Sequence, residues 1–310
     1  MHLARTTRNF PFDLVAAGSV ATIGAYDGLH LGHQQLLQRV LEASRGSGLP
    51  AVVMSFEPMP QEYFLAASPP ARLMRFREKF EALAEFGIDI FFCPRFDNAI
   101  KSIAADTFIR QILVQTLNIR RLVVGDDFRF AAGRQGKLQH LRRAGRVLEF
   151  DIEQVPSVVT VGERVSSTAI RAALASGDMD HATRLLGRPY RMSGKVIRGE
   201  RLGRTLGFPT ANVKLMRRQS AVMGIFAVRV SGLGGTVYDA VASVGTRPTF
   251  DGTRPLLEVH LFDFDEDIYG AYIHVNFVAR LRSEEKFDDI DELVEQMHRD
   301  SAQAREILAA

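Results

Sequence analysis

The sequence lacks several features that would assign it to particular protein classes. It has one cysteine in 310 residues, Cys93, so no disulfide can form within the chain, as is usual in a reducing compartment. No stretch reaches the ~18 apolar residues that a membrane-spanning helix needs. No Walker A phosphate-binding sequence occurs either. These absences predict a cytoplasmic protein without a membrane partner.

A strong charge of one sign is also missing. The 39 basic and 36 acidic residues leave a net charge of +3. This small excess suits anionic small molecules and does not require nucleic acid as a partner. At 46% hydrophobic, the composition allows a sizeable core, and the length favours two domains or one large one.

The stretch from Ser19 to Leu41 carries the most specific local signal. Ser19–Ile23 reads as a β-strand, and the apolar residues between Leu36 and Leu41 have the spacing of a helix. A glycine-containing turn between them presents backbone N–H groups and a positive helix end, which favours an anion. His30 and His33 lie at this turn and could donate hydrogen bonds to phosphate oxygens. The alternative is an ordinary strand-to-helix loop with two exposed histidines.

Alternating strands and helices continue to about Phe150. We expect strands at 51–56, 88–93 and 122–124, and helices along the apolar stripes 73–83 and 108–113, the second with Asp106 near its N-cap. This succession predicts a parallel sheet covered by helices, with a ligand at the carboxyl ends of the strands.

Two later segments are expected to return to that edge of the sheet. Asp127 and Phe128 follow the strand at 122–124, although a plain charged loop would explain them equally well. Ser167 and Thr168 stand at a helix start with Arg171 one turn later, which predicts a second phosphate-binding group. A simple N-cap would account for the hydroxyls but not for the arginine.

The pattern changes after Gly187. Short β segments at 190–197, 225–230, 237–244, 256–262 and 272–281 predict a small antiparallel barrel. A final helix from about Asp289 should turn its apolar side inward, with Ile290, Leu293, Val294 and Met297. We therefore expect two domains, 1–186 and 187–310.

Polar residues within the barrel region form a third candidate group. Glycines 199, 203 and 207 lead to Thr210 and Asn212, which we expect in a phosphate-covering loop with their oxygens holding Mg²⁺. A flexible β-loop is the alternative. Along 256–262, Glu258 and His260 should face away from Leu257 and Val259.

Taken together, the motifs resemble those of the bifunctional prokaryotic riboflavin kinase/FMN adenylyltransferase (FAD synthetase) family from about Val15 to the last helix. The matching stretches are 24–33, 55–58, 127–130, 167–171, 207–212 and 258–270. The resemblance implies a Rossmann-like nucleotidyltransferase domain followed by a riboflavin kinase barrel. It implies ATP, riboflavin and FMN as substrates and Mg²⁺ as cofactor, and it leaves a homo-oligomer open.

The resemblance also implies roles for individual residues. Catalytic roles fall to His30, His33, Arg171 and Glu258. Flavin contacts fall to Phe56, Asp127, Phe128 and Arg282. ATP contacts fall to Gly24, Asp27, Gly32, Ser167, Thr168, Gly203, Thr210 and Asn212, with the last two also binding the metal. Rival interpretations are a member that keeps one of the two activities, and a non-catalytic nucleotide- or RNA-binding regulator on the same fold.

Overall fold

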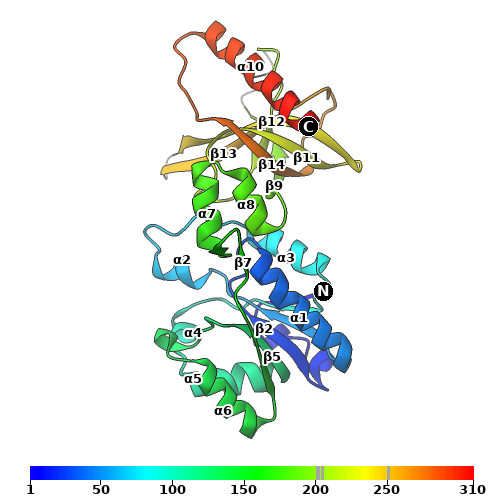
Figure 1. Cartoon of the computed structure of the whole chain (residues 1–310), viewed down its shortest axis with the longest axis vertical. Coiled ribbons are helices and arrows are strands. Elements are labelled where there is room, and N and C mark those ends of the chain that lie inside the picture. The colour runs from blue at the N-terminus through cyan, green and yellow to red at the C-terminus, as the bar shows by residue number, and fades with distance from the viewer. Residues whose placement is uncertain (200–202, 204–205, 250–251) are drawn as a thin grey trace. The chain divides into compact units, whose positions relative to one another are not determined.

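The computed structural model describes residues 1–199, 203, 206–249 and 252–310 (Figure 1). Its contacts divide the chain into two compact units. The first comprises Met1–Pro70 and Met74–Val165, and the second comprises Ala71–Leu73 and Ser166–Ala310. Among the residues described, no helix is both long and apolar enough to cross a bilayer.

A six-stranded parallel sheet forms the centre of the first unit, as the sequence predicts. The strand order is β1-β4-β3-β2-β5-β6. The bounds are β1 His2–Ala4, β2 Ser19–Ile23, β3 Ala51–Met54, β4 Ile90–Phe92, β5 Ile119–Gly125 and β6 Asp151–Val155. The helices of this unit are α1 Leu31–Ser47, α2 Pro60–Phe64, α3 Phe76–Glu85, α4 Asn98–Ser102, α5 Ala105–Thr107, the π-helix η3 Phe108–Thr116 and α6 Leu138–Leu148. Short 3-10 turns lie at Thr7–Asn9, Phe12–Val15 and Ala132–Arg134, and a small hairpin joins β7 Val159–Thr160 to β8 Glu163–Arg164.

Two apolar layers cover the sheet because successive strand residues point to opposite faces. Val53 and Val123 pack with Leu37 and Leu83, which come from α1 and α3. Their strand neighbours Met54 and Leu122 belong to the opposite layer, with residues of η3 and α6. Burial on both faces explains why these strands read as continuous apolar runs rather than as alternating ones.

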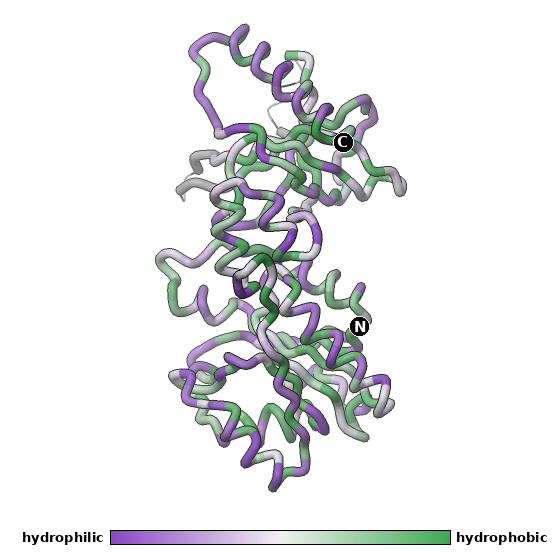
Figure 2. Tube along the Cα trace, in the orientation of Figure 1, coloured by the Kyte–Doolittle hydropathy of each residue, from purple (hydrophilic) through white to green (hydrophobic). Residues whose placement is uncertain are grey.

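A closed antiparallel barrel dominates the second unit, in the order β10-β13-β12-β11-β14-β9. The strands are β9 Tyr190–Ile197, β10 Ala211–Lys214, β11 Gly224–Leu233, β12 Thr236–Thr249, β13 Gly252–Leu261 and β14 Tyr272–Arg282. Helices α7 Ser167–Ser176 and α8 Met179–Leu186 precede the barrel, and α10 Ile290–Ala309 follows it. α10 is mostly hydrophilic along its length (Figure 2) and packs on the barrel through Ala304 and Leu308.

Some predicted elements differ in detail from the observed ones. The first stripe becomes helical only at Phe76, so Leu73 lies outside α3. Asp106 lies inside the short α5, whose N-cap is Ala104. Asn212, expected in a loop, belongs to β10, a strand that the sequence reading missed. The expectation for Ile290 is wrong: it is 64% exposed, because the buried side of α10 begins further along, at Asp300.

The domain boundary at 186/187 stays a prediction. The compact units divide after Val165, twenty-one residues earlier in the chain, because α8 packs against β9 and β14. Arg280 of β14 also donates a hydrogen bond to the carbonyl of Ser176 at the end of α7. The two helices therefore pack with the barrel rather than with the parallel sheet.

Candidate active sites

The turn between β2 and α1 brings two histidine rings together at the helix N-terminus. His30 is the N-cap of α1, and its Nδ1 accepts a hydrogen bond from the backbone N–H of His33 at 3.3 Å. The two rings stack with 3.6 Å between centroids. Gly32 permits this arrangement, since a Cβ there would lie 3.3 Å from the His30 ring. Because Nδ1 of His30 accepts, the proton of the neutral ring is on Nε2, which makes Nε2 a donor.

His33 lies in surroundings that keep its ring neutral. Burial, the neighbouring His30 and the ammonium of Lys79 lower the pKa of His33 well below its usual value. Lys79 is 2% exposed, and its Nζ donates a hydrogen bond to the carbonyl of Ala25 in the same turn. Nδ1 of His33 is buried and has no hydrogen-bond partner among the residues that the structure describes. An unpaired buried nitrogen is costly unless a ligand pairs with it, so this atom supports a binding role.

The remaining residues of the turn hold it in shape. Asp27 is 2% exposed and accepts a hydrogen bond from the N–H of Met74 at 2.9 Å. Gly24 lies against the ring of Tyr26, whose hydroxyl is 2.6 Å from Thr22 Oγ1. Asp27 and Gly24 therefore contribute to the turn's conformation, whatever they contact in a complex.

The predicted flavin contacts of the first unit follow neighbouring strands. Phe56 comes after β3, and Asp127 and Phe128 come after β5, so they lie at the same edge of the sheet as the His30 turn. Phe56 is partly buried beside Phe96, with ring centroids 5.5 Å apart. Asp127 forms an ion pair of 2.7 Å with Arg164. Phe128 stacks on Phe130 with ring centroids 5.8 Å apart, so both aromatic rings and the carboxylate have partners within the protein.

The hydroxyl and arginine group lies at the start of α7. Ser166, not Ser167 or Thr168, is the N-cap, and its Oγ accepts the N–H of Ala169 at 3.1 Å. Arg171 donates from Nε to the carbonyl of Ala71 at 2.7 Å. These residues belong to the second compact unit, so a site shared with the histidine pair stays a prediction.

In the second unit, polar side chains from three adjacent strands form a row. Asn212 of β10 pairs with Glu258 of β13, and Glu258 pairs with Ser243 of β12. Directly paired residues point to the same face. Leu257 and Val259 are fully buried on the other face, as the alternation predicts.

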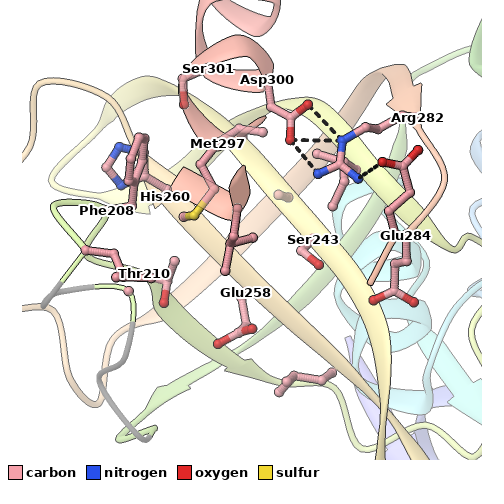
Figure 3. A pocket seen from close by; sticks show the side chains of 18 of the residues that line it. Phe208, Thr210, Ser243, Glu258, His260, Arg282, Glu284, Met297, Asp300 and Ser301 are labelled. Carbon is pink, nitrogen blue, oxygen red and sulfur yellow. Dashed lines mark hydrogen bonds and ion pairs between the residues drawn. The ribbon is translucent and has the colours of Figure 1, made fainter. Parts of the chain in front are cut away.

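This row lines a cavity of about 440 Å³, which we call the barrel cavity (Figure 3). Its apolar walls include Ile225, Phe287, Leu293 and Met297. His260 lies beside the row, and its Nδ1 is 2.9 Å from the carbonyl of Pro209, a contact that fixes the turn before Thr210. A few polar groups among apolar walls are typical of a site for a small organic molecule.

A second cavity of about 330 Å³ shares Thr210 with the barrel cavity. We call it the Tyr269 cavity; Phe264 and Tyr269 also line it. Gly203 lies beside Thr210, and a Cβ there would clash with the carbonyl of Phe208. The rest of the glycine-spaced stretch, at 200–202 and 204–205, lies outside the described residues.

Arg282 lines the cavity, and its guanidinium is bound to α10. It forms three hydrogen bonds to the Asp300 carboxylate: from Nε to Oδ1 at 2.9 Å and to Oδ2 at 3.1 Å, and from Nη2 to Oδ2 at 2.8 Å (Figure 3). Asp300 is 4% exposed and also accepts from Gln296 at 2.8 Å. A direct flavin contact by Arg282 stays a prediction, and the observed role is to fix the segment after β14.

Sequence reasoning missed several residues of these sites. Lys79 and Asp300 lie on helices α3 and α10, where the spacing of apolar residues predicts a buried side but does not single out a charged residue. Ser243 is a polar residue within the mostly apolar strand β12. A charged residue at a buried helix position was the available signal for the first two. No sequence signal identified Ser243, because its importance comes from its pairing with Glu258.

Comparison with known proteins agrees with this two-part arrangement. Residues 14–169 match the FAD synthetase family, and residues 186–308 match the riboflavin kinase family. The chain is 48% identical to the bifunctional riboflavin kinase/FMN adenylyltransferase of Escherichia coli strain K12, over 93% of this chain and 92% of that protein. The protein of the same name from Haemophilus influenzae is 43% identical, with 94% of each chain covered.

A solved structure covers the chain as well. A crystal structure titled macrolide-efflux protein, from Streptococcus pneumoniae, superposes with a TM-score of 0.80 at 30% identity, over 98% of both chains. The two family matches and the relatives that span both of them lead to one assignment. The chain belongs to the bifunctional riboflavin kinase/FMN adenylyltransferase family.

Proposed function

We propose that this chain phosphorylates riboflavin to FMN and then adenylylates FMN to FAD, using ATP in both steps. The observation that carries the proposal is that each family match contains its own polar site. The histidine pair lies in the first, and the Asn212–Glu258–Ser243 row lies in the second. The substrates are small molecules: ATP, riboflavin and FMN.

Adenylyl transfer at the histidine site needs charge stabilisation rather than a base. The FMN phosphate is already largely ionised at neutral pH and can attack the α-phosphate of ATP directly. Negative charge then builds on the α-phosphate and on the departing pyrophosphate. His30, His33 and the N–H groups at the start of α1 are donors held in place for that charge. We assign Ser167, Thr168 and Arg171 to the same reaction, with loss of one donor costing ~10²–10³ in rate.

Phosphorylation of riboflavin requires a proton acceptor, because the terminal ribityl hydroxyl is neutral. Glu258 supplies a carboxylate that faces the barrel cavity, beside Asn212. We place riboflavin in the barrel cavity and ATP in the Tyr269 cavity, whose aromatic walls suit a purine ring. Thr210 lines both cavities, so it marks the point where the γ-phosphate passes from one substrate to the other.

Magnesium fits the residues at this junction. The Thr210 hydroxyl and the Asn212 amide oxygen are the hard ligands that Mg²⁺ accepts, with phosphate oxygens completing the shell. Among the described residues no cluster of three or more His, Cys, Asp or Glu could hold a metal by itself. When bound, the ion neutralises charge that develops on the transferring phosphoryl group.

The test is to incubate the purified chain with Mg²⁺ and ATP, together with either riboflavin or FMN, and to separate the flavins by HPLC. We expect FMN and FAD from riboflavin, and FAD from FMN. FMN alone would indicate a member with the kinase activity only. No new flavin in either reaction would overturn the proposal.

Three further expectations stay predictions: a cytoplasmic location, the absence of nucleic acid among the partners, and assembly into a homo-oligomer. Size-exclusion chromatography with light scattering would test the last of these.

A further inference from the structure

Glu284 places a second carboxylate in the barrel cavity. It lies on the segment after β14, and its side chain reaches back to the strand β12 (Figure 3). Gly245 makes this approach possible, because a Cβ on Gly245 would overlap Oε1 of Glu284. Any other residue at 245 would displace the Glu284 carboxylate from its position in the cavity.

This carboxylate has no direct pairing partner among the residues that the structure describes: Glu284 forms no hydrogen bond and no ion pair with them. The charge of Arg282 acts on it, but that guanidinium is held by the bidentate pair with Asp300. Partial burial raises the pKa of Glu284, which agrees with a carboxylate placed against apolar walls. A group in such a position gains most from a donor brought by a ligand.

The strand register places Gly245, which Glu284 contacts, near Glu258 on one face of the sheet. Glu258 pairs with Ser243, and Leu256 pairs with Gly245, so Gly245 is the diagonal neighbour of Glu258. Diagonal neighbours on one face are about 7–8 Å apart. Glu284 therefore lies within one ligand's length of Glu258, along the same wall of the cavity.

We propose that Glu284 is a specificity-determining residue of the kinase site, and that its carboxylate accepts hydrogen bonds from the inner hydroxyls of the ribityl chain. This inference rests on the proposed function, because it takes Glu258 as the group that meets the terminal hydroxyl. A carboxylate held against the diagonal strand position, on the same wall of the cavity, then meets the chain away from its terminal hydroxyl.

The consequence is selectivity for flavins that carry a polyol. Hydrogen bonds from hydroxyls to a carboxylate are about twice as strong as neutral ones. A site with an unpaired carboxylate therefore favours riboflavin over a flavin ring without the chain, since the latter leaves the carboxylate unpaired.

The experiment compares riboflavin with lumiflavin, which has the same ring and no ribityl chain. The readouts for the full-length protein with MgATP are the KM and kcat for riboflavin phosphorylation and the inhibition constant of lumiflavin against it. For Glu284→Gln we expect KM to rise about tenfold, and for Glu284→Ala about 10–100-fold. The kcat should stay within about threefold, because the contact is equal in the ground and transition states. The lumiflavin constant should stay within about twofold.

Glu295→Gln is the matched control, since this glutamate is on α10, its side chain is 73% exposed and it pairs with Arg299. The rate of FMN adenylylation is measured for each variant, and an unchanged rate shows that the chain is folded. An unchanged riboflavin KM in Glu284→Ala would overturn the inference, as would a parallel rise of the lumiflavin constant. Absence of riboflavin phosphorylation in the unaltered protein would instead overturn the proposed function.

Discussion

At the scale of single residues, His33 shows how its surroundings set a protonation state. Its pKa is lowered in the folded chain, so below about pH 6.5 the unfolded chain binds more protons than the folded one. The contribution of this residue to stability is therefore complete above pH 6.5 and is lost as the pH falls toward the folded-state pKa.

We predict that His33→Gln reduces the pH dependence of stability. Between pH 6.5 and 5.5 the unaltered chain should lose up to about 1 kcal/mol more unfolding free energy than the variant. Urea titrations followed by circular dichroism at several pH values measure this difference. The titration of the carboxylates changes the stability of both proteins equally and therefore cancels in the comparison. Parallel stability curves for the two proteins would contradict the prediction.

Another residue-scale prediction concerns Gly199. A Cβ at this position would overlap the amide of Asn212, so Gly199→Ala must displace that side chain from the kinase site. We expect kcat/KM for riboflavin phosphorylation to fall about tenfold or more, with FMN adenylylation unchanged. Gly46→Ala is the control, because nothing lies near its Cβ position. An unaffected kinase in Gly199→Ala would show that Asn212 does not need its observed position.

At the scale of elements, the ion pair between Arg282 and Asp300 joins the end of β14 to α10. Asp300 is 4% exposed, so removal of its charge leaves the largely buried Arg282 guanidinium with only the Ser283 carbonyl and a 3.9 Å pair to Glu285. We predict that Asp300→Asn destabilises the chain by about 3 kcal/mol. The double variant Arg282→Met with Asp300→Leu should recover most of that loss, because it leaves no unpaired charge. Denaturant midpoints of the two single variants and the double variant test this, and purely additive losses would argue against a coupled pair.

The individual strands and helices also show which elements could be predicted from sequence patterns and which could not. The strands β2 and β9 have the predicted bounds, because short apolar runs between turn residues specify them locally. The sequence did not predict β10, because a segment of four residues is too short to show a periodic pattern. These residues form a strand because they pair with β9 and β13. Ile290 was misplaced for a related reason: the sequence predicts the helix, but only packing against the barrel decides which part of its length is buried.

At the scale of the whole molecule, the proposed sites give the two reactions different residues, so the two activities should be separable. We predict that Glu258→Ala or Asn212→Ala abolishes formation of FMN and leaves conversion of FMN to FAD intact. His30→Ala should have the opposite effect. HPLC of the flavin products from each variant, with riboflavin or FMN as substrate, measures both activities. Loss of both activities in a folded variant would rule out two independent sites.

The sequence by itself determined the fold class, the order of the two parts and the identity of the His30–His33 and Thr210–Asn212 motifs. These depend on local spacing: an apolar run, a glycine turn and the residues next to them along the chain. Only the tertiary structure decided that Arg282 pairs with Asp300, that Lys79 lies beside His33 and that Glu284 enters the barrel cavity. Each of these contacts joins residues far apart in sequence or depends on the closure of the barrel. A charge that becomes buried needs a partner, and folding supplies that partner from elsewhere in the chain. The spacing of residues along one strand or helix therefore does not predict such contacts.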